Sequence, residues 1–295
     1  MRIALIISLI IIFFGVGHSQ TCCSAGAPLV SSYGFKTSVD RPFSINLGYR
    51  HIGINRLVDN NTRLVNDPRT RENSIISIGG NYTINDRFSL GLLLPIVLQN
   101  RTTISESQSS FGAGDLTLIG QIFLLQKNDW SIHLTPAVKF PTGKVDVRSD
   151  RNIFLSPDMQ SGTGSWDNIN QITFVKDRIF NSSITFKTSV AYRINGTNPD
   201  FSSFNGSTGR SFKFGNELNW RTTVTREFLV GQWFVVPDLQ LQVRHAGANT
   251  EQESRANNSG GTWLNQIIGL YLTRDNIYSY RTCLLYTSPS PRDRG

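Results

Sequence analysis

The sequence contains few cysteines, few methionines and no long apolar segment in its interior. Only three Cys and two Met occur in 295 residues. Three cysteines cannot form the disulfide framework of a small secreted domain. After the N-terminus, no uninterrupted run reaches the roughly 18 apolar residues that a membrane-spanning helix requires. The composition therefore excludes a disulfide scaffold and a polytopic helical membrane protein.

Motifs for metal, nucleotide and nucleic-acid binding are also missing. The chain has no HExxH motif and no cluster of Cys and His. The letters PTGK at residues 141–144 lack the first Gly and the final Ser or Thr of a P-loop. The formal charge of +8 is spread along the chain, whereas nucleic-acid binding needs cations gathered on one face. We therefore expect no enzyme, no cofactor and no nucleic-acid partner.

What the sequence does contain is a strict alternation of apolar and polar residues, clearest over residues 74–98. Apolar side chains occupy every second position on both sides of the turn Asn85-Asp86-Arg87. This period of two predicts an antiparallel hairpin with strands of about ten residues. Soluble sheets usually have shorter strands. A transmembrane β-barrel needs about 9 to 11 residues per strand, apolar toward lipid and polar toward the lumen.

The same alternation recurs along the chain and predicts eleven strands. Long polar segments alternate with tight charged turns, the segments being 55–73, 100–114, 141–168, 195–211 and 246–261 and the turns 85–87, 127–129, 176–178, 225–227 and 273–276. Outer-membrane barrels have this asymmetry, with short periplasmic turns and long extracellular loops. Bacterial barrels also have an even number of strands. We therefore predict an all-β, antiparallel up-and-down transmembrane β-barrel of about twelve strands, formed by residues 42–282 and lacking its last strand.

The N-terminus is predicted to lie outside the barrel wall. Arg2, the apolar run after it and small residues before Gln20 predict a cleaved signal peptide over residues 1–19, and hence export to the cell outer membrane. Residues 20–41 would form an exported N-terminal segment. Its adjacent Cys22 and Cys23 could join a partner or bind a soft metal, and an idle tail is the alternative.

The C-terminal segment 283–295 is also predicted to lie outside the barrel. Its sequence, CLLYTSPSPRDRG, looks like translated sequencing adapter and contains two closely spaced prolines. We interpret it as a non-native tail that replaces the last strand. An incomplete barrel would then leave a gap beside the first strand.

Most charged residues of the predicted strands lie on the polar face. An Arg or Lys that faces lipid at mid-depth costs about 2 to 4 kcal/mol, so these residues identify the lumen side. The candidate permeation residues are Arg50, Lys139, Lys187, Arg193, Lys213, Glu217, Arg221, Asp238, Arg244 and His133. Two interpretations remain open: a lumen that favours anions or polarised solutes, and a salt-bridged filling that holds the wall together.

His133 could also suggest an enzyme, because outer-membrane phospholipases carry a catalytic Ser–His pair on a barrel. Their pair faces outward at the membrane edge, whereas His133 is predicted to face inward. No matching Ser/His motif accompanies it. We interpret His133 as a lumen residue in a hydrogen-bond network.

Three motifs resemble, in order and spacing, a known family of outer-membrane barrels. They are residues 112–118 (GAGDLTL), 136–144 (PAVKFPTGK) and 161–167 (SGTGSWD). The family is the one associated with the meta-cleavage pathway of phenol degradation, and the resemblance covers mainly residues 86–194. Lys144 and the residues before Gly162 depart from its pattern.

The resemblance implies an outer-membrane channel or uptake protein for small molecules, with aromatic or other small hydrophobic compounds as cargo. Outer-membrane lipid and a small-molecule solute would be its partners. The alternative is a structural or adhesive surface barrel that acts through its long loops.

Overall fold

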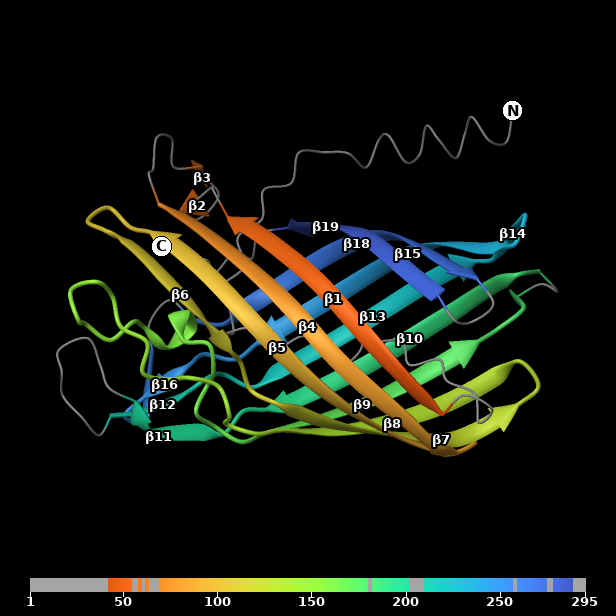
Figure 1. Cartoon of the computed structure of the whole chain (residues 1–295), viewed down its shortest axis with the longest axis horizontal. Coiled ribbons are helices and arrows are strands. Elements are labelled where there is room, and N and C mark those ends of the chain that lie inside the picture. The colour runs from red at the N-terminus through yellow and green to blue at the C-terminus, as the bar shows by residue number, and fades with distance from the viewer. Residues whose placement is uncertain are drawn as a thin grey trace.

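The described part of the chain is built almost entirely of antiparallel strands. The computed structural model describes residues 42–54, 58–59, 62–63, 69–179, 182–201, 210–256, 259–274 and 278–288. The strands form a strongly curled sheet (Figure 1). None of the helices among the described residues is long and apolar enough to cross a membrane.

Eleven strands follow one another as neighbours around the sheet, and they run in sequence order. They are β1 (Phe43–Ile54), β4 (Thr70–Asn85), β5 (Phe88–Thr102), β7 (Thr117–Lys127), β8 (Trp130–Lys139), β9 (Asp167–Lys176), β10 (Ile184–Ile194), β13 (Glu217–Arg226), β15 (Trp233–Ala246), β18 (Gly261–Arg274) and β19 (Tyr278–Ser288). The predicted all-β, up-and-down fold is confirmed. Among the described residues, no ladder joins β1 to β19, so the curled sheet has two edges.

Side-chain exposure alternates along each strand, as the period of two predicts. On β5, Leu90 and Leu92 are 47% and 49% exposed, whereas Leu93, which faces the other way, is 1% exposed. On the paired strand β4, Ile78 points outward, while Asn81 is buried on the inner face. The outer face is therefore apolar over most of its area, and the inner face is mainly polar, the arrangement that a lipid-facing barrel wall requires.

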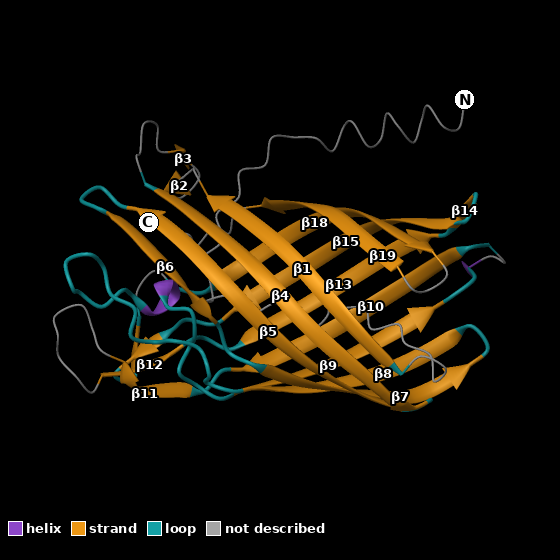
Figure 2. Ribbon diagram, viewed as in Figure 1, coloured by secondary structure: helices purple, strands orange, loops and turns teal. Residues whose placement is uncertain are grey.

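Hairpin turns and long connections lie at opposite ends of the sheet (Figure 2). The hairpins β4–β5 and β7–β8 turn over two residues each, at 86–87 and 128–129. The long connections contain short strands: β2 (Val58–Asp59), β3 (Thr62–Arg63), β6 (Ser107–Ala113), β11 (Thr197–Phe201), β12 (Arg210–Lys213), β16 (Thr250–Glu251) and β17 (Ser254–Arg255). Strands β11, β12, β16 and β17 pair into a separate sheet, and β6 pairs with β5. The end with these connections is called the loop end below.

Three sequence predictions differ from the structure. Lys213 lies on β12, in the small sheet of the loop end, and so is not part of the barrel wall. The turn predicted at 225–227 lies at 231–232, because β14 (Phe228–Val230) continues the hairpin to Gly231, whose φ is +62°.

The third difference concerns the C-terminal segment. Strand β19 pairs with β18 as far as Ser288, although we expected the wall to end at Thr282. The rest of the predicted tail lies outside the described residues, as do the predicted signal peptide, the segment 20–41 and Cys22 and Cys23.

Candidate site at the loop end of the barrel

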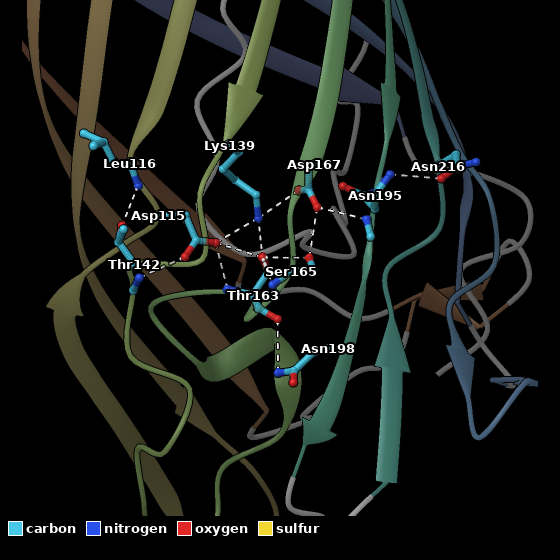
Figure 3. A network of polar contacts seen from close by, with 12 residues as sticks. Asp115, Leu116, Lys139, Thr142, Thr163, Ser165, Asp167, Asn195, Asn198 and Asn216 are labelled. Carbon is cyan, nitrogen blue, oxygen red and sulfur yellow. Dashed lines mark hydrogen bonds and ion pairs between the residues drawn. The ribbon is translucent and has the colours of Figure 1, made fainter.

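Lys139, the last residue of β8, is the centre of a buried polar network. Its side chain is 1% exposed. The Nζ atom lies 2.8 Å from Oδ2 of Asp115 and 2.8 Å from Oδ2 of Asp167 (Figure 3). It also donates a hydrogen bond to the Thr163 hydroxyl. One ammonium group is thus shared by two buried carboxylates, a geometry in which each charge compensates the others.

The two carboxylates bind backbone as well as Lys139. Asp115 accepts hydrogen bonds from the Gly143 N–H at 2.9 Å and from the Thr163 N–H at 2.9 Å. Asp167 accepts from the Ser165 hydroxyl at 2.9 Å and from the Gly196 N–H at 3.1 Å. The network therefore joins the beginnings of β7 and β9, the end of β8 and the connection 140–166. We call this set of contacts the Lys139 network.

Two glycines allow the connection 140–166 to fold back on itself. A Cβ atom on Gly143 would lie 2.6 Å from the Cα of Gly162, and one on Gly162 would lie 2.6 Å from the Cα of Gly143. Any other residue at either position would push the two segments apart. Gly143 of the second motif and Gly162 of the third are thus explained by this close backbone approach.

The far part of the connection 140–166 is held on the inner face of β4 and β5. Arg71 of β4 donates to the Asp158 carboxylate and, at 2.6 Å, to the Asp158 carbonyl. Gln99 of β5 is fully buried and donates to the Gln160 carbonyl at 3.2 Å. Met159 is buried completely between these contacts. Residues 158–160 of the connection therefore lie against the inner face of the wall at the loop end.

The charge of Asp158 is stabilised by two arginines. Burial alone would raise the pKa of Asp158, but Arg71 and Arg101 beside it, with a hydrogen bond from Ser156, hold that pKa below its ordinary value of 3.8. Arg101 Nη1 lies 3.5 Å from the carboxylate. Asp158 is therefore ionised at neutral pH and ties the connection to β4 and β5.

A second group of charged residues lies on the inner face of β10, β13 and β15. Glu217 of β13 binds Arg244 of β15 at 2.8 Å, and the Arg244 guanidinium lies 5.0 Å from the ring of Trp263. Arg193 of β10 faces Glu217 across the ladder and is 4% exposed. Its Nε and Nη2 atoms have no hydrogen-bond partner among the described residues.

The remaining predicted site residues are distributed over the inner face. Arg50 on β1 and Lys187 on β10 are half-buried, and Arg221 on β13 is buried. Asp238 on β15 is buried and accepts a hydrogen bond from Gln240 Nε2 at 2.6 Å. These four residues do not join the Lys139 network.

His133 lies on the inner side of β8. Its ring nitrogens are 2.8 Å from the Ser131 hydroxyl and 3.3 Å from Gln121 Nε2. Its contacts are thus those of a hydrogen-bonded lumen residue.

Sequence reasoning missed the partners of Lys139 and the residues that hold the connection 140–166. Asp115, Thr163 and Asp167 were visible as motif letters, but nothing in the periodicity indicates that they meet. Arg71 and Asp158 are far apart in the sequence and lie in polar segments, so no pattern singles them out.

The family model described as putative MetA-pathway of phenol degradation matches residues 73–265. The chain belongs to this family. All three motifs that converge on Lys139 lie within the matched residues. The resemblance inferred from these motifs is thus confirmed.

A solved structure has the same fold over almost its whole length. The crystal structure of an outer membrane channel from Pseudomonas putida F1 matches with a TM-score of 0.63 and 14% sequence identity. The match covers 87% of this chain and 98% of that one. The curated proteins contain no match. The chain therefore has the fold of an outer-membrane β-barrel channel.

Proposed function

We propose that this protein is an outer-membrane channel through which small molecules cross, and that its cargo includes aromatic or other small apolar compounds. The fold supports a role in the outer membrane, because exposed Leu, Ile, Phe and Trp side chains cover the outside of the strands. The polar inner face supports a path for solutes.

The observation that carries the proposal is the position of the connection 140–166. Porin-like channels need a constriction that selects solutes, and an inward-folded loop provides one. Here Arg71 and Gln99, both on the inner face, bind Asp158 and Gln160 of that connection. A surface barrel that acts only through its loops has no need for its longest connection to bind the inner face of the wall. This contact therefore favours a channel over an adhesive barrel.

An apolar cluster supports the aromatic part of the proposal. Leu93, Ile119, Ala137 and Ile169 lie together on the inner face, and each is at most 3% exposed. The cluster makes this part of the inner wall apolar, and a small apolar solute that displaces the side chains covering it can bind there through the hydrophobic effect.

Liposome swelling with the purified protein tests the proposal. Vesicles that contain the protein should swell in solutions of small ionised aromatic solutes, such as benzenesulfonate, faster than empty vesicles. The cargo assignment predicts faster entry for benzenesulfonate than for a disaccharide of higher mass. Equal swelling of loaded and empty vesicles with every solute would refute the channel function.

A further inference from the structure

Arg193 is a buried cation with two donor atoms, Nε and Nη2, from which no described residue accepts a hydrogen bond. Its side chain is 4% exposed, and Nε and Nη2 have no hydrogen-bond partner among the described residues. A buried donor without an acceptor costs free energy, so nearly all such groups in proteins are paired. The position of Arg193 therefore calls for an acceptor that is not among the described residues.

The carboxylates nearest to Arg193 in the sheet are already bound to other cations. Glu217, opposite on β13, binds Arg244 at 2.8 Å. Asp167, at the beginning of the other neighbouring strand, binds Lys139 at 2.8 Å. Both negative charges are thus compensated elsewhere, and the charge of Arg193 remains available to an anion.

A second unused donor lies beside Arg193. The Asn219 side chain is 3% exposed, and its Nδ2 has no partner among the described residues. Its Oδ1 accepts a hydrogen bond from Gln242 Nε2 at 2.9 Å, which fixes the direction of the amide. Asn219 faces Ala191 across the β10–β13 ladder, so it is the diagonal neighbour of Arg193 on the same face. Diagonal neighbours are close enough for a long side chain to share a ligand with them.

The other side of Arg193 is apolar. Ile169 faces Arg193 across the β9–β10 ladder, and it belongs to the buried cluster with Ala137, Ile119 and Leu93. The register places Ile119, Ala137 and Ile169 in one row across the sheet, with Arg193 at its end. Two donors therefore adjoin a buried apolar cluster.

We propose that Arg193 and Asn219 form a subsite for the oxyanion of a small solute whose apolar body lies on Ile169 and its neighbours. A carboxylate fits this chemistry, because two oxygens can accept from the guanidinium and the amide together. The apolar row selects a body such as a benzene ring. The proposal rests on the proposed channel function, and it assigns the solute class of that channel.

Calorimetric titration of the detergent-solubilised protein tests the subsite, with benzoate and its neutral analogue benzamide as probes. Benzoate should bind saturably, and benzamide should bind about tenfold more weakly or less, as expected for the loss of a charge-assisted hydrogen bond. The Arg193→Gln variant should lose at least about tenfold in benzoate affinity and little in benzamide affinity. Arg193→Lys, which keeps the charge but not the planar fork, should recover part of the loss.

Arg178→Gln is the control, because Arg178 is an exposed turn residue paired with Asp129 at the opposite end of the barrel. Heat-resistant migration on a gel shows that each variant has folded.

Two results would overturn the subsite: equal benzoate affinity in the unaltered protein and Arg193→Gln, or equal binding of benzoate and benzamide. Either result would mean that water alone satisfies the donors of Arg193. If benzoate binding depends on Arg193 but no solute enters vesicles, the channel function fails and the subsite stands. If solutes enter vesicles equally well with and without Arg193, and benzoate binding does not depend on Arg193, the channel function stands and the subsite fails.

Discussion

Lys139 and Arg193 are two buried cations on the inner face of the same wall, and they are bound very differently. Lys139 contacts the carboxylates of Asp115 and Asp167, both at 2.8 Å, and the Thr163 hydroxyl. Arg193 has two donor atoms without a partner among the described residues, although Glu217 faces it across the ladder. Both side chains are less than 5% exposed.

The difference separates two uses of charge inside a barrel. Lys139 joins strands to the connection 140–166, so its charge serves the structure and is fully compensated. Two donor atoms of Arg193 have no partner among the described residues, so its burial carries a cost in stability. Natural proteins retain such costs mainly at functional sites. We therefore propose that the two interpretations left open by the sequence, salt-bridged filling and an anion-favouring lumen, apply to different residues of the same face.

The largest effect is expected for Lys139→Met. This change removes the cation and leaves Asp115 and Asp167 buried side by side without compensation, which costs about 3 to 5 kcal/mol. Outer-membrane assembly of the variant, measured by its heat-resistant band in membrane extracts, should be strongly reduced. Arg193→Gln in parallel should assemble normally. Normal assembly of Lys139→Met would show that the Lys139 network does not stabilise the barrel.

The next effect tests the strand register that places both cations inside. Leu239 of β15 is 60% exposed on the outer face, and the adjacent Gln240 is buried on the inner face. Leu239→Arg should lower stability in lipid by about 2 to 4 kcal/mol, because its charge would face the bilayer. Gln240→Arg should be tolerated, since Asp238 lies within reach and can accept a hydrogen bond. Urea unfolding in lipid vesicles measures both, and equal losses would disprove the assigned faces.

The wall of the barrel could be predicted from the sequence because its pattern is local. Each strand repeats every two residues, and each hairpin turn follows directly in the chain, so eleven strands were recognised in their correct order. The small sheet of β11, β12, β16 and β17 could not be predicted. Its strands have two to five residues, too few to show a period, and its pairing joins segments that are far apart in the sequence.

The candidate site was predictable only in part, for the same reason. Alternation placed Lys139 and Arg193 on the polar face, but it cannot show which carboxylate reaches which cation. Asp115, Lys139 and Asp167 meet because three strand ends converge at the loop end (Figure 3). The displaced turn has a local cause: the charged residues at 225–227 resemble a turn, whereas the backbone reverses at Gly231, where a positive φ is easily adopted.

A smaller effect is expected at Asp158, which holds the connection 140–166 to β4 and β5. The pKa of Asp158 in the folded protein is lower than its ordinary value of 3.8. The ionised carboxylate therefore stabilises the fold at any pH above 3.8, and this contribution is lost as the pH falls through the lowered pKa of the folded protein. The partly exposed ion pairs of Asp158 should contribute about 1 kcal/mol or less.

Asp158→Asn imitates acidification at neutral pH, since it removes the charge and keeps the shape. In a chain whose three cysteines are changed to serine, a thiol reagent should label Met159→Cys faster when Asp158→Asn is also present. Arg151→Gln is the matched control, because Arg151 is exposed and lies 3.8 Å from Glu106. Equal labelling rates with and without Asp158→Asn would show that these ion pairs do not hold the connection in place.

The smallest effect on stability is expected for Arg193→Gln, and its sign distinguishes the two cations. Removing a charge that has no carboxylate partner of its own among the described residues also removes its desolvation cost, so the variant should unfold at the same urea concentration as the unaltered protein or at a slightly higher one. Added benzoate should raise the midpoint of the unaltered protein, because a ligand that binds only the folded state stabilises it, and should leave the midpoint of Arg193→Gln unchanged. A clear loss of stability in Arg193→Gln without ligand would mean that Arg193, like Lys139, is bound by the protein itself, and the contrast between the two cations would disappear.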